Sequence, residues 1–185
     1  MNSNLRGSAL RARRSMSDAD RQTANQIINK KVLRSREFFA AKTIGLYLPM
    51  RDEVDPREII ERAWRANKRV FCPVIDKNGQ MNFHHLGRNT LLLQNDFGIW
   101  EPANNKIISA RQLDLVITPL VAFDKNRNRI GMGGGSFDRH FSFLRHRQNW
   151  LRPKLLGVAF ACQEVDRIDP NPWDIRLYSI CSNSS

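Results

Sequence analysis

The sequence has no long apolar run and no paired cysteines, and these absences exclude several classes of protein. No stretch approaches the roughly 18 apolar residues of a membrane span, and the start of the chain has no apolar core of a secretory signal. Asp18 and Asp20 argue against an organelle transit peptide. Cys72, Cys162 and Cys181 are odd in number, widely spaced and without a CxxC pair, which argues against a zinc site or a disulfide framework. We therefore expect a cytoplasmic protein with reduced thiols and no membrane partner.

Acidic residues are also scarce, with 18 Asp and Glu against 30 Lys and Arg and a net charge of +12. The segment 125–154 carries eight basic residues and one acid, Asp138. Such a charge favours a polyanionic partner, although a solvated basic face needs no ligand at all. Nucleic acid is one candidate partner. The chain has two tyrosines and no RNP-like, helix-turn-helix or zinc-finger spacing, so nucleic-acid binding is the less favoured alternative.

Short apolar runs alternate with helical patterns along the chain. Buried strands are predicted over residues 43–50, 69–75, 81–86, 113–123 and 155–160. The strand–helix–strand step between 43–50 and 69–75 implies parallel pairing. We predict an α/β fold with three layers, a mostly parallel open sheet with helices on both faces, formed by a single domain over residues 1–185.

The helices are predicted from their caps and from their apolar spacing. Ser17, followed by Asp20 at the capping-box position, starts a helix that we expect to run to about Phe39. Asp55 is a good N-cap, and Pro56 suits the first position of a helix to about Ala66. Two further helices are predicted over residues 4–14 and 136–148, the second with Phe137, Phe141 and Leu144 on one face.

The segment "RIGMGGGSFDR" (129–139) places four glycines in five positions between a predicted strand and a predicted helix. In open α/β sheets ligands bind at the carboxyl ends of strands, and a glycine-rich loop before a helix offers free backbone N–H groups to a phosphate. Arg129 and Arg139 add positive charge, and Asp138 is suited to a magnesium ion. The spacing matches neither a P-loop nor the dinucleotide fingerprint, so by itself it also fits a plain turn.

A longer stretch around these glycines, "LDLVITPLVAFDKNRNRIGMGGGSFDRHF", resembles the signature segment of the 5-formyltetrahydrofolate cyclo-ligase (methenyltetrahydrofolate synthetase) family. Four further blocks resemble that family in the same order: "LRGSALRARRSMSDADR", "IGLYLPMRDEVDPREIIERAWRANKRVFCPVI", "FGIWEP" and "NPWDIRL". The resemblance implies an enzyme that uses ATP and Mg²⁺ to convert 5-formyltetrahydrofolate, as the monoglutamate or polyglutamylated, into 5,10-methenyltetrahydrofolate, ADP and phosphate. It implies no obligatory protein partner.

The resemblance also implies roles for individual residues. ATP is expected at Arg6, Arg129, Ile130, Gly131, Met132, Gly133, Gly134, Gly135, Ser136 and Phe137. The folate is expected at Leu48, Glu53, Met132, Gly133, Gly134, Gly135 and Ser136. Magnesium is expected at Asp138 and Asp174, and catalysis is assigned to Arg129 and Asp138.

The chain departs from the family pattern at a few positions. Asn2 stands where the family usually has Lys, Ser136 replaces an aromatic residue, and Phe137 lacks the usual hydroxyl. Without the resemblance, Glu53 would be interpreted as loop charge and Asp174 as a helix cap. Another ATP-dependent ligase or kinase that uses the same glycine-rich loop is the remaining alternative.

Overall fold

A central sheet organises the chain in the computed structural model, which describes residues 2–50, 52–95, 98–149 and 152–184. Seven strands follow the order β11-β10-β7-β1-β2-β3-β6. The neighbours from β11 to β2 pair in parallel, whereas β3 and β6 pair antiparallel. The bounds are β1 (Thr43–Gly45), β2 (Arg69–Ile75), β3 (Met81–His85), β6 (Ile107–Ile108), β7 (Leu115–Pro119), β10 (Lys154–Val158) and β11 (Ser179–Cys181). The predicted α/β class and the parallel pairing of the first two strands are confirmed.

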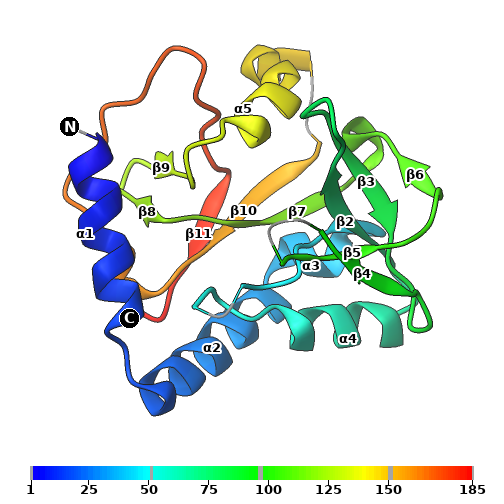
Figure 1. Cartoon of the computed structure of the whole chain (residues 1–185), viewed down its shortest axis with the longest axis horizontal. Coiled ribbons are helices and arrows are strands. Elements are labelled where there is room, and N and C mark those ends of the chain that lie inside the picture. Colours follow the sequence, from blue (N-terminus) through cyan, green and yellow to red (C-terminus); the bar gives the residue numbers. More distant parts are fainter. Residues whose placement is uncertain (1, 51, 96–97, 150–151, 185) are drawn as a thin grey trace.

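Helices lie on both sides of this sheet (Figure 1). The α-helices are α1 (Asn2–Arg14), α2 (Asp18–Leu33), α3 (Arg36–Ala40), α4 (Arg57–Arg65) and α5 (Ser136–His140). Short 3₁₀ helices are η1 (Ala110–Gln112), η2 (Ser142–Asn149) and η3 (Ala161–Gln163). Apolar residues of α2, α3 and α4 share one core cluster with the sheet, and residues of α5 and η2 share another. The sheet is therefore the middle of three layers.

Alternating side chains of the strands feed the two core clusters. Leu115 and Ile117 of β7 point toward α2 and α4, whereas Val116 between them points to the opposite face. Glycine is required where a neighbour comes very close: a Cβ on Gly157 would lie 2.6 Å from a methyl carbon of Leu177. This packing holds the carboxyl ends of the parallel strands β1, β7 and β10 at one edge of the sheet.

A small hairpin carries the chain from that edge to the glycine-rich segment. It pairs β8 (Ala122–Phe123) with β9 (Arg129–Ile130), and α1 packs against it through Ala9. Figure 1 shows α1 beside β8 and β9, outside the main sheet. A second hairpin pairs β4 (Leu92–Gln94) with β5 (Trp100–Pro102). The start of the chain is thereby fixed next to a segment more than 100 residues away, as the Arg6–Gly131 contact shows.

Several predicted boundaries are wrong. The helix expected to reach Phe39 stops at Leu33, because the Ser35 hydroxyl bonds the Val32 carbonyl and caps α3 through the Phe38 N–H. The strand expected over 43–50 ends at Gly45, and that over 113–123 divides into β7 and β8. The helix expected over 136–148 is α only to His140 and continues as 3₁₀. The Ser17 cap is confirmed, since its hydroxyl accepts from the Asp20 N–H.

Among the described residues, no helix has both the length and the apolar character that a membrane crossing requires.

Candidate active site

The glycine-rich loop, Gly131–Gly135, is an exposed connection between β9 and α5. Gly133 and Gly135 have φ angles of +115° and +61°, which L side chains rarely adopt, so the backbone favours glycine at both positions. Within the described residues, none of the amides of this loop donates a hydrogen bond to the protein. The loop therefore presents free N–H donors, as phosphate binding requires.

Arg6 of α1 holds the glycine-rich loop from one side. Its Nε donates to the Gly131 carbonyl at 3.0 Å. Its guanidinium carbon lies 3.8 Å from the point where a Cβ on Gly133 would stand. A Cβ there would make only ordinary van der Waals contact with Arg6, so Gly133 is favoured by its positive φ angle and not by a lack of space.

Arg139 holds the loop from the other side. It donates to the Gly134 carbonyl at 2.8 Å and to the Ser136 hydroxyl at 3.2 Å. The helix that follows is only five residues long, so its dipole is small, contrary to the long helix expected here. The positive potential at the loop comes from guanidinium groups instead.

Under the loop, the buried Arg129 forms an ion pair with the partly buried Asp138. The Arg129 side chain is 4% exposed, and both its terminal nitrogens donate to Asp138 Oδ1, at 3.1 and 3.0 Å. The Ile175 N–H donates to the same oxygen at 2.9 Å, and the Ile175 carbonyl accepts from Arg129 at 3.2 Å. Burial lowers the pKa of Arg129, and Asp138 and Asp174 oppose that shift. An arginine stays charged even so, so a fixed cation lies at the base of the site.

Asp174 lies in a turn near the end of the chain, and its carboxylate is held by Asn171. The backbone N–H and the side-chain amide of Asn171 both donate to Asp174 Oδ2, at 2.8 and 3.2 Å. No helix follows Asp174 in the described residues, so the alternative of a helix cap is wrong.

A cleft of about 350 Å³ joins these groups. Its lining is strongly charged and comes from α1, β9, the glycine-rich loop, α5, η2 and the C-terminal turn. The lining residues are Arg6, Arg129, Ile130, Gly131, Gly133, Gly135, Asp138, Arg139, Arg145, Asn171, Trp173 and Asp174. Arg145, Asn171 and Trp173 were not predicted as site residues. The "NPWDIRL" block contained a signal for the last two.

Other predicted residues do not line this cleft. Met132, Gly134, Ser136 and Phe137 belong to the same segment, but Phe137 packs on the core with its ring 4.8 Å from the Arg129 guanidinium. Leu48 packs partly buried against the core on the other side of the sheet. The side chain of Asn2, where a lysine was expected, lies outside what the structure describes.

Glu53 lies on the segment 46–54 that follows β1, which we call the β1 loop. β1 and β7 are parallel neighbours, so this loop leaves the same sheet edge as the chain that leads to the glycine-rich loop. Glu53 Oε2 accepts from the Met50 N–H at 3.0 Å. Burial raises the pKa of Glu53, although the Met50 hydrogen bond and the charge of Arg13 oppose the shift. Glu53 does not line the cleft, and its carboxylate is a hydrogen-bond acceptor held on the β1 loop by the Met50 N–H.

The donor set of the cleft fits a magnesium ion bound together with phosphates. No cluster of three or more His, Cys, Asp or Glu side chains is found among the described residues. Magnesium commonly takes only one or two carboxylates and completes its shell with phosphate oxygens and water. Asp138 and Asp174 line the same cleft and both act on Arg129, so two carboxylates converge at one place.

Comparison with known proteins finds similarity along nearly the whole chain. The sequence model of the 5-formyltetrahydrofolate cyclo-ligase family matches residues 1–183. The 5-formyltetrahydrofolate cyclo-ligase of Haemophilus influenzae is 34% identical, over 95% of this chain and 94% of that protein. The Escherichia coli K12 protein of the same name is 33% identical, over 93% of this chain and 94% of that one.

Solved structures share the fold. The structure of Aquifex aeolicus 5,10-methenyltetrahydrofolate synthetase superposes with a TM-score of 0.85, covering 100% of this chain and 90% of that chain at 24% identity. A 5,10-methenyltetrahydrofolate synthetase from Mycoplasma pneumoniae gives a TM-score of 0.75, with 99% of both chains covered and 24% identity.

Proposed function

Because the chain belongs to the 5-formyltetrahydrofolate cyclo-ligase family, we propose that it converts 5-formyltetrahydrofolate and ATP into 5,10-methenyltetrahydrofolate, ADP and phosphate. A formamide carbonyl is a poor electrophile, and its oxygen is a poor leaving group. Phosphorylation of that oxygen by the γ-phosphate removes both obstacles, with ADP as the first product. N10 then attacks the formyl carbon and loses its proton, and phosphate departs to leave the methenyl bridge between N5 and N10.

The observation that carries this proposal is the combination of free amides and arginines around one cleft. The amides of Gly131–Gly135 have no protein acceptor among the described residues, and the Arg6 and Arg129 guanidinium groups flank them. Phosphoryl transfer needs little covalent help from a protein; it needs alignment and neutralisation of charge on the transferred group. These groups supply fixed donors for that purpose.

The folate side of the proposed site is the β1 loop. We assign Leu48 to apolar contact with the substrate and Glu53 to a hydrogen bond with the reduced pterin or with N10–H. Glu53 supports this role because its carboxylate is already held by the Met50 N–H. The exposed Met132 and the Ser136 hydroxyl complete the wall between the two substrates.

Asp138 and Asp174 are the residues that we assign to magnesium. The ion, when bound with ATP, neutralises charge on the phosphates. Oδ1 of Asp138 accepts from Arg129 and Ile175, and its other oxygen has no donor among the described residues. Asp138 therefore has both a structural contact and a free ligand atom.

We also propose a cytoplasmic protein in which residues 1–185 act as one domain without an obligatory protein partner. Two observations support this. The seven-stranded sheet includes strands from Thr43 to Cys181, and α1 packs on the β8–β9 hairpin. The three cysteines are all free, as expected for a reducing compartment.

Gly131→Ala tests the nucleotide site most sharply. A Cβ at Gly131 meets no protein atom within 4 Å, and its φ angle lies outside the positive range, so the free protein accommodates the change. We expect an unchanged melting temperature and at least tenfold weaker ATP binding, because the methyl group occupies the space of a close phosphate. Gly98→Ala is the contrasting control: Gly98 has a positive φ, so this alanine is expected to lower the melting temperature, but Gly98 lies outside the cleft and ATP affinity is expected to stay at the wild-type value.

The activity itself is read from the near-ultraviolet absorbance of the methenyl product. Wild-type protein mixed with 5-formyltetrahydrofolate, ATP and magnesium is expected to generate it, and omission of ATP is expected to abolish it. Absence of product under complete conditions contradicts the proposed reaction. Wild-type ATP affinity in Gly131→Ala contradicts the proposed role of the glycine-rich loop.

A further inference from the structure

Arg13 is a buried charge that the proposed site does not use. Its side chain is 3% exposed, and it bonds the Asp52 carboxylate through Nε at 3.1 Å and through Nη2 at 3.0 Å. Burying a guanidinium group is costly unless it is paired in good geometry. Arg13 does not line the cleft, so its burial needs another explanation.

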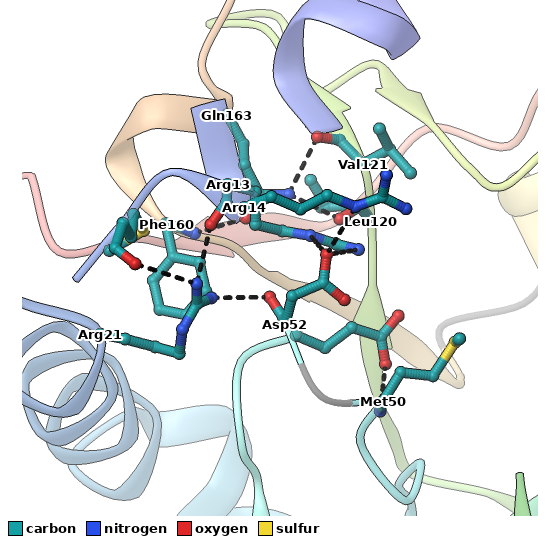
Figure 2. Close-up of polar contacts among 11 residues, drawn as sticks. Arg13, Arg14, Arg21, Met50, Asp52, Leu120, Val121, Phe160 and Gln163 are labelled. Carbon is teal, nitrogen blue, oxygen red and sulfur yellow. Dashed lines mark hydrogen bonds and ion pairs between the residues drawn. The ribbon is translucent and has the colours of Figure 1, made fainter. Parts of the chain in front are cut away.

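The partner of Arg13 lies on the β1 loop, directly before Glu53. Figure 2 shows Arg13, Arg14 and Arg21 gathered around Asp52, with Met50 further along the same loop. Arg21 donates to the Asp52 carbonyl at 3.0 Å and to the Arg13 carbonyl at 2.9 Å. The end of α1 and the β1 loop are therefore joined through both side chain and backbone.

The spacing along α1 links this junction to the glycine-rich loop. Arg6 and Arg13 are seven residues apart, so they lie on the same face of the helix, two turns and about 10 Å apart along its axis. Arg6 bonds the Gly131 carbonyl, and Arg13 bonds the neighbour of Glu53. One face of one helix thus contacts both loops that we assign to the two substrates.

We propose that Arg13 is a positioning residue: through Asp52 it fixes the β1 loop on α1, so that ATP at the glycine-rich loop and 5-formyltetrahydrofolate at Glu53 strengthen each other's binding. This inference rests on the proposed function. A nucleotide that bonds Arg6 restricts α1, and a restricted α1 holds the β1 loop in its binding position. Because coupling between two sites is reciprocal, the folate raises the affinity for ATP by the same factor.

A purely stabilising ion pair makes a different forecast. Its loss would lower the melting temperature and leave the coupling between the two substrates as it is in wild type. The coupling factor separates the two roles. It is the ratio of the folate dissociation constants without and with a non-hydrolysable ATP analogue and magnesium.

The test measures that factor by calorimetric titration in wild type, Arg13→Gln, Asp52→Asn and Arg14→Gln. We expect wild type to bind 5-formyltetrahydrofolate about tenfold more tightly with the analogue than without it, within the usual range of such couplings. Arg13→Gln and Asp52→Asn are expected to reduce the factor to below about twofold and to raise the KM for folate. Arg14 is the matched control, since its side chain is 68% exposed and only 3.6 Å from the same carboxylate. Arg14→Gln is expected to keep the wild-type factor.

Arg13→Lys serves if Arg13→Gln does not fold. A lysine keeps the charge but has one donor group in place of the paired Nε and Nη2 contacts, so we expect an intermediate factor. A wild-type factor of one overturns the inference, and so does an unchanged factor in folded Arg13 and Asp52 variants. These results come from binding alone. They are distinct from failure of the proposed function, which is a wild-type protein that forms no methenyl product.

Discussion

The carboxylate of Asp138 has two proposed roles: one oxygen contacts the protein, and the other is assigned to the metal. Oδ1 accepts from Arg129 and from the Ile175 N–H, and an asparagine in its place keeps an acceptor there. Asp138→Asn is therefore expected to fold with a lowered melting temperature, because the buried Arg129 loses its charged partner, to lower kcat about 100-fold, and to leave folate affinity within about threefold. Steady-state kinetics and folate titration measure this. Asp169→Asn is the control, because Asp169 pairs with exposed Arg167 away from the cleft. Wild-type turnover at saturating magnesium in the Asp138 variant contradicts the metal assignment.

The ionisation of Glu53 affects the stability of the folded protein, and the same side chain is assigned to folate binding. Burial raises the pKa of its carboxyl in the folded protein above the ordinary value of 4.5, against the opposing hydrogen bond from Met50. Because the folded state then binds the proton more tightly than the unfolded state, stability falls as pH rises from 4.5 through the folded pKa. Glu53→Gln removes this loss. We expect a variant that is at least as stable as wild type at pH 7, with folate binding weakened about tenfold.

Denaturation midpoints between pH 4 and pH 7, together with folate titration, test this Glu53 prediction. The difference in stability between variant and wild type is expected to shift in favour of the variant as pH rises. Equal pH profiles would show that Glu53 titrates normally. Unchanged folate affinity would remove Glu53 from the site.

At the scale of elements, Asp114 ties β1 to β7. Its Oδ2 accepts from the Lys42 and Thr43 N–H groups at 2.8 and 2.9 Å, and from the Thr43 hydroxyl at 2.9 Å. Burial alone would raise the pKa of Asp114, but these hydrogen bonds and Arg152 outweigh it and hold the pKa below its ordinary 3.8. A depressed pKa gives stability that is present above pH 3.8 and is lost as pH falls through the folded pKa.

Asp114→Asn is accordingly expected to lower the free energy of unfolding by about 1 to 2 kcal/mol at pH 7. The deficit is expected to shrink below pH 3.8, where the wild-type carboxylate takes up its proton. Urea denaturation at pH 7 and at pH 3 measures both quantities. A deficit that is the same at both pH values would mean that the charge of Asp114 contributes nothing.

The elements also show which features the sequence alone could predict. Local signals were sufficient for the start of α2 at Ser17 and for the end of β7 at Pro119, because cap and strand end depend on the residues themselves. The break at Ser35 lies inside an apolar pattern that continues on both sides, so periodicity does not reveal it. Residues after Gly45 are buried like a strand. The chain nevertheless leaves the sheet, and the Tyr47 hydroxyl bonds the Val54 carbonyl to close the β1 loop.

The candidate site also contains some residues that the sequence could predict and others that it could not. The glycine-rich segment and Asp174 were predicted from contiguous blocks that resemble a known family. Arg145 was not predicted. It lines the cleft because η2 packs on the second core cluster, and the sequence does not show that packing. The Arg13–Asp52 pair joins residues 39 positions apart, and no local pattern indicates such a contact.

At the scale of the whole molecule, the net charge of +12 acts on both proposed substrates. ATP and the glutamate tail of the folate are anions, so the field of the protein raises their encounter rate and affinity. Salt screens that field, and the Debye length falls from about 30 Å at 0.01 M to about 8 Å at 0.15 M.

We expect KM for both substrates to rise severalfold over this range while kcat changes little. A triglutamate form of the folate is expected to show a steeper rise than the monoglutamate, because it carries more charge. Steady-state kinetics in sodium chloride, with both folates at each salt concentration, measure the two slopes. Equal slopes would mean that the basic surface does not act on the added glutamates of the folate tail.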